Sequence, residues 1–363
     1  MSMSSRQRIT CALEHREPDR TPLFEYVLLS PLADFFLGHV HAGDPDNWAQ
    51  LEAKLGWHQA VRQYAIDMLD LATRLDHDML YVIPNWTANT GRPTATDDKQ
   101  PPDDPVECLQ LRNQEQANSP AGLSDERLLI YNDLREEMCR RELDLPILAP
   151  AYTHGIWTDI DLMQTMLLDP EVAHEHFRLA TRQALAMTER YLELGIDQIG
   201  VGGDIAGNDP LISPVMYHTF IMPEVRQVVR RIHKAGAWAV TASDGNLWSI
   251  IDDWLLGCEV DGYLEIDYHA GMDLALLKPR FGQRVTFYGN MDPGLTLSFA
   301  SPDEVRQATI TCLQAGWGQG GHVFCSSNAI TASVPPANYL VMLTAYRDFF
   351  GLEPLVLTKN RAR

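Results

Sequence analysis

The stretch AWAVTASDGNLWSIIDDWLLGCEVDGYLEID, residues 237–267, contains two short apolar runs with room for one helix between them. The first run starts at residue 237 and ends in the polar sequence SDGN, and the second starts at residue 260 and ends on Glu265. Strands that alternate with helices pair in parallel through right-handed crossovers. The stretch therefore predicts one strand–helix–strand unit of an α/β fold.

The same unit recurs along the chain. Eight apolar or β-branched runs, each followed by a helix-like stretch, start at residues 21, 78, 146, 197, 237, 260, 284 and 322. Eight such units predict an α/β fold of the (β/α)8 or TIM-barrel class, with residues 1–363 as a single domain. Helix starts are marked by Asp169, Ser213 and Ser301, each of which precedes a proline.

Two segments fall outside the repeating unit. Residues 1–20 have the pattern of a capped amphipathic helix, which we expect to pack across the barrel. Residues 88–124 lie between predicted strands 2 and 3 and are rich in Pro, Asp, Gln and Thr. We expect them to form an insertion that folds over the barrel mouth as an irregular hairpin.

The composition excludes several classes of partner. The chain has 29 basic and 49 acidic residues, a formal net charge of −20, which repels nucleic acid and anionic membrane surfaces. The sequence has neither a signal-peptide pattern nor a run of 18 apolar residues, so we expect a cytoplasmic protein. Its six cysteines lack paired spacing, which predicts reduced thiols.

Polar side chains end the predicted strands, where the catalytic groups of a barrel lie. The candidates are Glu25, Asn85, His154, Asp204, Asp244, Asn246, Glu265, Asn290, Asp292, Ser326, Ser327 and Asn328. Five of them are carboxylates, and like charges around one mouth raise the pKa of at least one. Such a group can act as a general acid, or the cluster can hold a cation. Strand ends also need polar caps and turns, so each residue has a purely structural alternative, such as a loop histidine bonded to a backbone carbonyl for His154.

Several motifs at these strand ends resemble a known superfamily. They are YLELGIDQIGVGGDIAGNDP from residue 191, the stretch quoted above, YGNMD from residue 288 and GGHVFCSSNAI from residue 320. They resemble the uroporphyrinogen decarboxylase-like superfamily, which includes porphyrinogen decarboxylases and corrinoid-linked methyltransferases. The resemblance covers most of the chain and implies a (β/α)8 barrel that is commonly a homodimer.

The chain departs from both well-known branches of that superfamily. Porphyrinogen decarboxylases carry an Arg-Gln-Ala-Gly-Arg motif after the first strand, whereas this chain reads FEYVLLSPLADFF from residue 24. Thiol methyltransferases hold zinc with a His-x-Cys pair and a later Cys, and the corresponding positions here are Ala242, Asp244 and Asn328. Two of these three positions cannot serve as zinc ligands. We therefore expect neither zinc nor any other tightly bound cofactor.

The resemblance implies a corrinoid-linked methyltransferase that demethylates a small substrate, with a corrinoid protein as partner. Asp204, Asp244 and Glu265 would then protonate or polarise the leaving group, with His154 as a hydrogen-bonding partner. The expected substrate-binding residues are Glu25, Asn85, Asn246, Asn290, Asp292, Ser327 and Asn328. Two alternatives stay open: a decarboxylase or other lyase that uses Asp204 or Asp244, and a barrel that binds a ligand without turnover.

Overall fold

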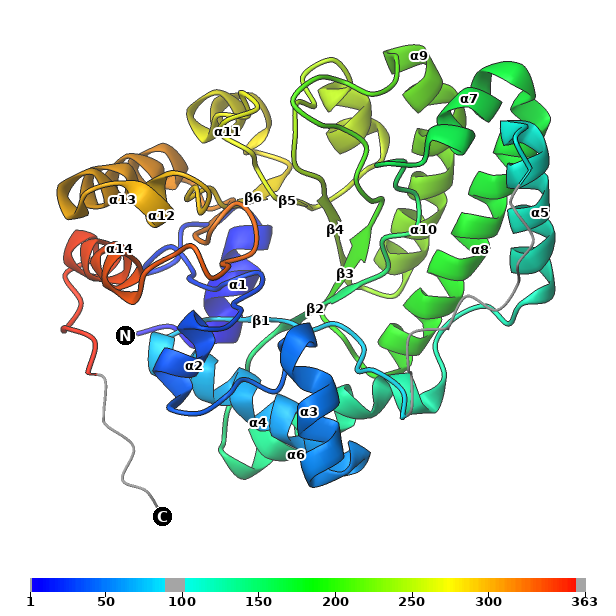
Figure 1. The fold of residues 1–363 in the computed structure, drawn as a ribbon. Coiled ribbons are helices and arrows are strands. Elements are labelled where there is room, and N and C mark those ends of the chain that lie inside the picture. Colours follow the sequence, from blue (N-terminus) through cyan, green and yellow to red (C-terminus); the bar gives the residue numbers. More distant parts are fainter. Residues whose placement is uncertain (1, 89–101, 357–363) are drawn as a thin grey trace.

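Seven parallel strands form one curled sheet at the centre of the molecule (Figure 1). The computed structural model describes residues 2–88 and 102–356. The strands follow one another across the sheet in chain order, and each neighbouring pair is parallel. They are β1 (Leu80–Tyr81), β2 (Ile147–Pro150), β3 (Gln198–Val201), β4 (Trp238–Ala242), β5 (Gly262–Leu264), β6 (Thr286–Tyr288) and β7 (His322–Val323). The predicted α/β class is confirmed, and seven of the eight predicted runs contain a strand.

The first predicted run does not form a regular strand. Its residues pair with the chain beyond β7 only through isolated parallel bridges, Leu23 with Phe324 and Leu28 with Ile330. On its other side, the Asp78 backbone nitrogen donates a hydrogen bond of 2.6 Å to the Leu23 oxygen just before β1. Leu23 therefore lies between the two edges of the seven-stranded sheet.

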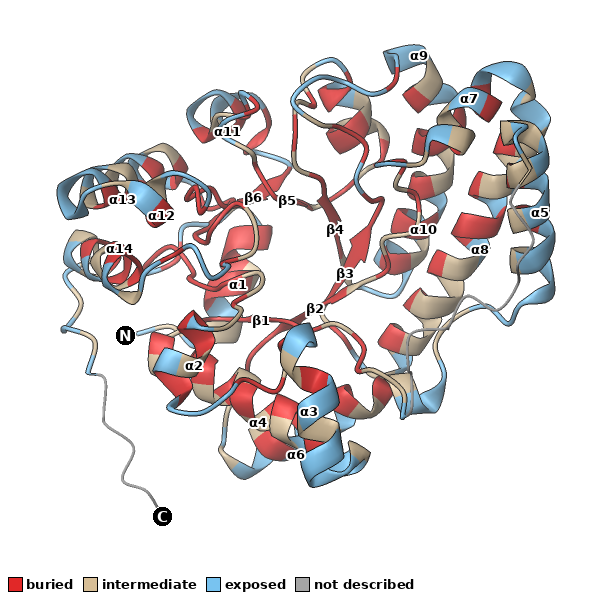
Figure 2. Cartoon of the chain, in the orientation of Figure 1, coloured by how far each residue is buried: buried red, intermediate tan, exposed pale blue. Residues whose placement is uncertain are grey.

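Helices surround the sheet, and their inward faces are buried together with the strands (Figure 2). The helices are α1 (Ser5–Leu13), α2 (Leu32–Leu37), α3 (Pro45–Leu55), α4 (Trp57–Leu75), α5 (Pro105–Asn118), α6 (Leu129–Arg140), α7 (Ile160–Leu168), α8 (Pro170–Glu193), α9 (Pro214–Met216), α10 (Met222–Lys234), α11 (Leu274–Phe281), α12 (Thr296–Phe299), α13 (Pro302–Gly316) and α14 (Pro336–Phe349). The predicted N-caps are confirmed, because Asp169, Ser213 and Ser301 each accept a hydrogen bond from the first turn of α8, α9 and α13.

Helix α1 packs against the inner residues of the sheet. Ile9, Ala12 and Leu13 are buried in one cluster with inward-facing strand residues such as Val240 and Tyr288. Helix formation is favoured at its start by a capping box between Ser4 and Gln7. The predicted N-terminal helix is therefore present, and it fills the end of the sheet at which the strands begin.

A buried charge network lies beside α1. The Asp78 carboxylate accepts hydrogen bonds from Arg8 at 3.0 Å, from Arg20 at 2.7 Å and from the Leu23 backbone nitrogen at 3.0 Å. Asp78 is fully buried, and both arginines are nearly so. Charges that are buried in this way are tolerated only when their partners are all present.

The insertion predicted over residues 88–124 differs from the expected hairpin where it is described. Residues 89–101 lie outside the described part of the chain. The following segment forms helix α5, which packs along α7 and α8 on the outside of the molecule (Figure 1). An Asp104 N-cap and Pro105 at the first position explain why a helix begins there.

Two expectations from composition concern the chain as a whole. The cysteines are all free, as predicted, and Cys325 is a fully buried thiol. None of the helices in residues 2–88 and 102–356 combines the length and apolar character that crossing a bilayer requires.

Candidate active site

Three carboxylates meet at the mouth, which is the end of the sheet where the strands finish. Asp204 follows β3, Asp244 follows β4 and Glu265 follows β5, and these strands are neighbours in the sheet. Because adjacent parallel strands end at the same edge, their last side chains come together. The charges of Asp204 and Asp244 both act on Glu265. The structure thus brings together three of the four predicted catalytic residues.

Glu265 is the most perturbed of these groups. Its side chain is buried, and its φ of +69° is unusual for a residue other than glycine. Burial, and then the negative charges of Asp204 and Asp244, raise the pKa of Glu265 to about 8 from its ordinary 4.5. At neutral pH the carboxyl is therefore mainly protonated.

The other two carboxylates are more open to solvent. Asp204 is exposed on the rim, and its partial burial together with the charge of Asp244 raises its pKa. Partial burial and the charge of Asp267 raise the pKa of Asp244, while a hydrogen bond from Asn328 opposes that rise. None of the interactions that shift the pKa values of these three carboxyls comes from a lysine or arginine of the described chain. Within the part of the chain that the structure describes, no lysine or arginine therefore acts as a counter-charge to this cluster.

Two tyrosines that the sequence analysis did not select flank Glu265. Tyr26 lies close enough to the Glu265 carboxyl to lower its pKa, and the rings of Tyr26 and Tyr81 lie 4.4 Å apart between centroids. Both belong to the inner cluster of the sheet, as does Tyr152. The only signal in the sequence is the alternation of inward positions along the predicted strands, which places Tyr26 two residues after Phe24 and Tyr81 two residues after Met79.

The three positions that correspond to zinc ligands lie in the same region. Ala242 is the last residue of β4 and packs in the inner apolar cluster. The Asn328 amide nitrogen donates a hydrogen bond of 3.1 Å to Asp244. Zinc prefers three strong sulfur, imidazole or carboxylate ligands, and here one position is apolar and the other two are bonded to each other. Within residues 2–88 and 102–356, His, Cys, Asp and Glu side chains form no group of three that could hold a metal ion.

Gly245 allows the chain to turn tightly after Asp244. Its φ is +82°, and a Cβ atom at this position would lie 2.5 Å from the Gly207 carbonyl oxygen. The next residue, Asn246, donates its backbone N–H to that oxygen at 2.8 Å and accepts a hydrogen bond from the Trp248 backbone at 3.1 Å. The predicted substrate ligand Asn246 thus has a structural role in the turn.

Glu25 forms a second acidic centre next to the mouth. Its carboxyl accepts hydrogen bonds from the Ser326 hydroxyl at 2.6 Å and from the Tyr339 hydroxyl at 3.1 Å. Burial raises the pKa of Glu25 to about 7, although these donors oppose the rise. Ser327 is buried beside Ser326, and its backbone nitrogen bonds to the Met291 oxygen.

His154 lies apart from the carboxylate cluster. Its ring nitrogens contact the hydroxyls of Thr181, at 2.9 Å, and Thr153, at 3.2 Å. Burial lowers the pKa of His154 to about 3, so the ring is neutral. Asn85 is likewise buried, and it binds the backbone of Ile130 and Glu126. Both side chains are therefore bonded to neighbouring groups of the protein.

The last two predicted residues lie after β6. Asp292 pairs with His269 at 2.8 Å and accepts backbone hydrogen bonds at the start of α12. Burial opposes the effect of these donors, but together they hold the pKa of Asp292 below its ordinary range. Asn290 contacts the Met272 oxygen at 3.4 Å and the thiol of Cys312. Both residues line a surface pocket between α11 and α13, away from Glu265.

Comparison with known proteins adds a family to this geometry. A sequence model described as uroporphyrinogen decarboxylase (URO-D) matches residues 158–349. Uroporphyrinogen decarboxylases from Psychromonas ingrahamii and Coxiella burnetii are 33% and 27% identical, over 38% and 50% of this chain and 38% and 48% of their own lengths. The one from Cellvibrio japonicus is 23% identical over 66% of this chain and 69% of its own. The match therefore spans less than half of the first two relatives.

A solved structure has a fold similar to that of this chain over almost its whole length. The methyltransferase from Methanosarcina mazei has a TM-score of 0.61 and covers 96% of this chain and 100% of its own. The two sequences are 15% identical, so this likeness concerns the fold alone.

Proposed function

This chain belongs to the uroporphyrinogen decarboxylase (URO-D) family, and from that membership we propose that it is an enzyme whose reaction takes place at the carboxylate-lined mouth. We propose further that it removes a methyl group from a small methylated substrate and passes it to a corrinoid carried by a partner protein. In this proposal the curled sheet with its reduced first strand is a (β/α)8 barrel.

The observation that carries the proposal is the buried position of Glu265 beside Asp204 and Asp244, which raises its pKa to about 8. When a methyl group leaves an oxygen or nitrogen atom, the electron pair of the broken bond stays on that atom. A proton from the Glu265 carboxyl neutralises the charge that develops there, which lowers the barrier. A corrinoid bound to the partner would supply the nucleophile that accepts the methyl group. Asp204 and Asp244 contribute by keeping Glu265 protonated near neutral pH.

Zinc has no part in this proposal. We assign no zinc to residues 242, 244 and 328, because Ala242 has no donor atom and Asp244 and Asn328 are bonded to each other. Activation therefore falls on the leaving group, through proton donation, rather than on a metal-bound acceptor.

The test is a methyl-transfer assay with cob(I)alamin and a series of small O- and N-methylated donors. Loss of the cob(I)alamin absorption band is expected with at least one donor, and the rate should fall as the pH rises through about 8. Glu265→Gln should lower kcat by about 100-fold or more, the usual scale of a general acid. Glu171→Gln, an exposed change of the same kind on α8, should leave the rate unchanged. An unchanged cobalt spectrum with every donor would count against methyl transfer.

A decarboxylase is the second candidate, because the matched relatives are named uroporphyrinogen decarboxylases. The same protonated carboxyl could protonate the carbon that loses carbon dioxide. The absence of a cationic counter-charge at the described mouth disfavours a substrate with several carboxylates. Substrate-dependent release of carbon dioxide that is lost in Asp244→Asn would favour this candidate. Binding of a ligand without either reaction would indicate a non-catalytic barrel.

A further inference from the structure

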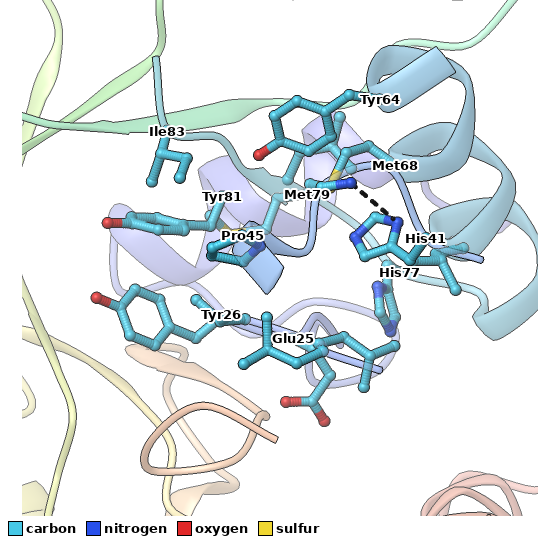
Figure 3. A pocket seen from close by; sticks show the side chains of 16 residues that line it. Glu25, Tyr26, His41, Pro45, Tyr64, Met68, His77, Met79, Tyr81 and Ile83 are labelled. Atoms are coloured by element: carbon cyan, nitrogen blue, oxygen red, sulfur yellow. Dashed lines mark hydrogen bonds between the residues drawn. The ribbon is translucent and has the colours of Figure 1, made fainter. Parts of the chain in front are cut away.

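A cavity of about 190 Å³ opens where the first run of the sheet separates from β1. Up to Leu23 the two segments are joined by the hydrogen bond from Asp78. Beyond this point the segment of residues 25–29 pairs with Ile330 instead. In the described chain no backbone hydrogen bond links this segment to β1. We call the resulting space the seam pocket. It lies between residues 25–29, β1 and helix α4 (Figure 3).

The lining of the seam pocket is apolar and aromatic. Leu28, Met68, Leu71, Met79 and Ile83 form much of the wall. The polar groups are the carboxyl of Glu25, the histidines 41 and 77 and three tyrosines. Among residues 2–88 and 102–356, no lysine or arginine lines the pocket. A carboxylate or phosphate on a ligand would therefore find no cation here and would lie beside Glu25.

Two aromatic rings separate the seam pocket from the catalytic candidate. Tyr26 and Tyr81 both line the pocket, and Figure 3 shows their hydroxyls pointing to the same side, away from His41 and His77. The Tyr26 side chain is close enough to the Glu265 carboxyl to lower its pKa, so this tyrosine lies next to both the pocket and Glu265. Tyr26 therefore links the seam pocket to the surroundings of Glu265.

We propose that the seam pocket binds the body of a neutral substrate that consists of a single apolar ring. An apolar cavity of about 150 Å³ is large enough for benzene, so about 190 Å³ accommodates one ring with a small substituent. Glu265 does not itself line the pocket, so a substituent on the ring would have to pass Tyr26 and Tyr81 to reach it. That this ring compound is the methyl donor rests on the proposed function, whereas its binding does not.

Toluene and benzoate are suitable probes because they share a ring and differ in charge. Calorimetric titration at pH 8 should show binding of toluene, and binding of benzoate at least about tenfold weaker, a difference of about 1.4 kcal/mol. Met68→Trp on α4 places a larger side chain in the pocket and should weaken toluene binding by at least about tenfold. Val27→Phe also places a larger side chain in the pocket, from the segment of residues 25–29, and should weaken toluene binding likewise. It serves as a second test in case Met68→Trp does not fold.

Met187→Trp is the matched control, because this partly buried methionine lies on α8, outside the seam pocket. It should bind toluene as the unaltered protein does. The proposal is overturned if toluene does not bind, if both filling variants bind it as well as the control, or if benzoate binds equally. Toluene binding without any methyl transfer to cobalt would refute the proposed function and keep the pocket assignment. Methyl transfer without toluene binding would refute the pocket assignment and keep the proposed function.

Discussion

Replacing Glu265 by Gln should stabilise the protein, and increasingly so as the pH rises. The folded state holds this carboxyl at a pKa of about 8, whereas an unfolded chain returns it to its ordinary 4.5. Between these values the folded state keeps a proton that the unfolded state has lost. The stability that Glu265 confers is therefore complete below about pH 4.5 and is lost as the pH rises towards 8. Glutamine does not ionise, so the variant escapes this loss.

The size of the effect follows from the two pKa values. At 1.36 kcal/mol per pH unit, the destabilisation of the unaltered protein is about 1 kcal/mol at pH 5, about 3 kcal/mol at pH 7 and about 5 kcal/mol at pH 9. Unfolding entropy is about 2.1 cal/mol/K per residue, so for 363 residues each kcal/mol moves the melting temperature by about 1.3 °C. The advantage of Glu265→Gln should therefore grow by about 5 °C from pH 5 to pH 9.

Differential scanning calorimetry of both proteins across this pH range measures the advantage directly. Other groups that titrate do so in both proteins, and their effects cancel in the difference. The exposed change Glu171→Gln should shift the melting temperature little at either pH, because surface substitutions usually stay within about 0.5 kcal/mol. A difference between Glu265→Gln and the unaltered protein that does not change with pH would refute a raised pKa at Glu265, and with it the proton donor.

Three further substitutions test other parts of the structure. Asp78→Ala removes the shared acceptor of two buried arginines and should lower the free energy of unfolding by about 3–5 kcal/mol in urea titrations; a loss below about 1 kcal/mol would show that the network is not needed. Gly203→Ala should destabilise the protein, because a Cβ there would lie 2.7 Å from the Gly155 nitrogen and the φ is +148°; an unchanged melting temperature would contradict this contact. Ser326→Ala removes a donor to Glu25 and should raise the pKa of Glu25 above about 7, as followed by carbon-13 NMR of the carboxyl; a lower pKa would contradict the assigned bond.

Local signals were sufficient for most strands and for several helices, although α5 formed where an irregular hairpin was expected. The start of α13 could be predicted because Ser301 and Glu304 have the spacing of a capping box and Pro302 follows the cap. The run from residue 21 was predicted as the first strand, but it forms only isolated bridges. An apolar alternating segment does not reveal whether the neighbouring strands on both sides will pair with it. It pairs with the chain after β7 but separates from β1, and the seam pocket results.

The candidate site could be predicted only in part. Asp204, Asp244 and Glu265 were identifiable because parallel strands end at one edge, which makes the ends of successive strands neighbours. The sequence could not reveal that His154 would turn to Thr181 instead, since the direction of a side chain depends on its packing. Tyr26 also escaped notice, because an inward tyrosine looks the same in sequence as any core residue.

The sequence by itself determined the α/β class, the order of the parallel strands, the helix caps, the acidic charge and the family, because these depend on local patterns and composition. Only the tertiary structure decided which of the carboxyls has the most strongly raised pKa, where the apolar pocket lies and which polar strand ends bond to neighbouring protein groups. Those properties depend on burial and on the distances between residues far apart in the chain. Glu265 illustrates the difference: its position at a strand end was readable, but its raised pKa arises from Asp204, Asp244 and the surrounding burial.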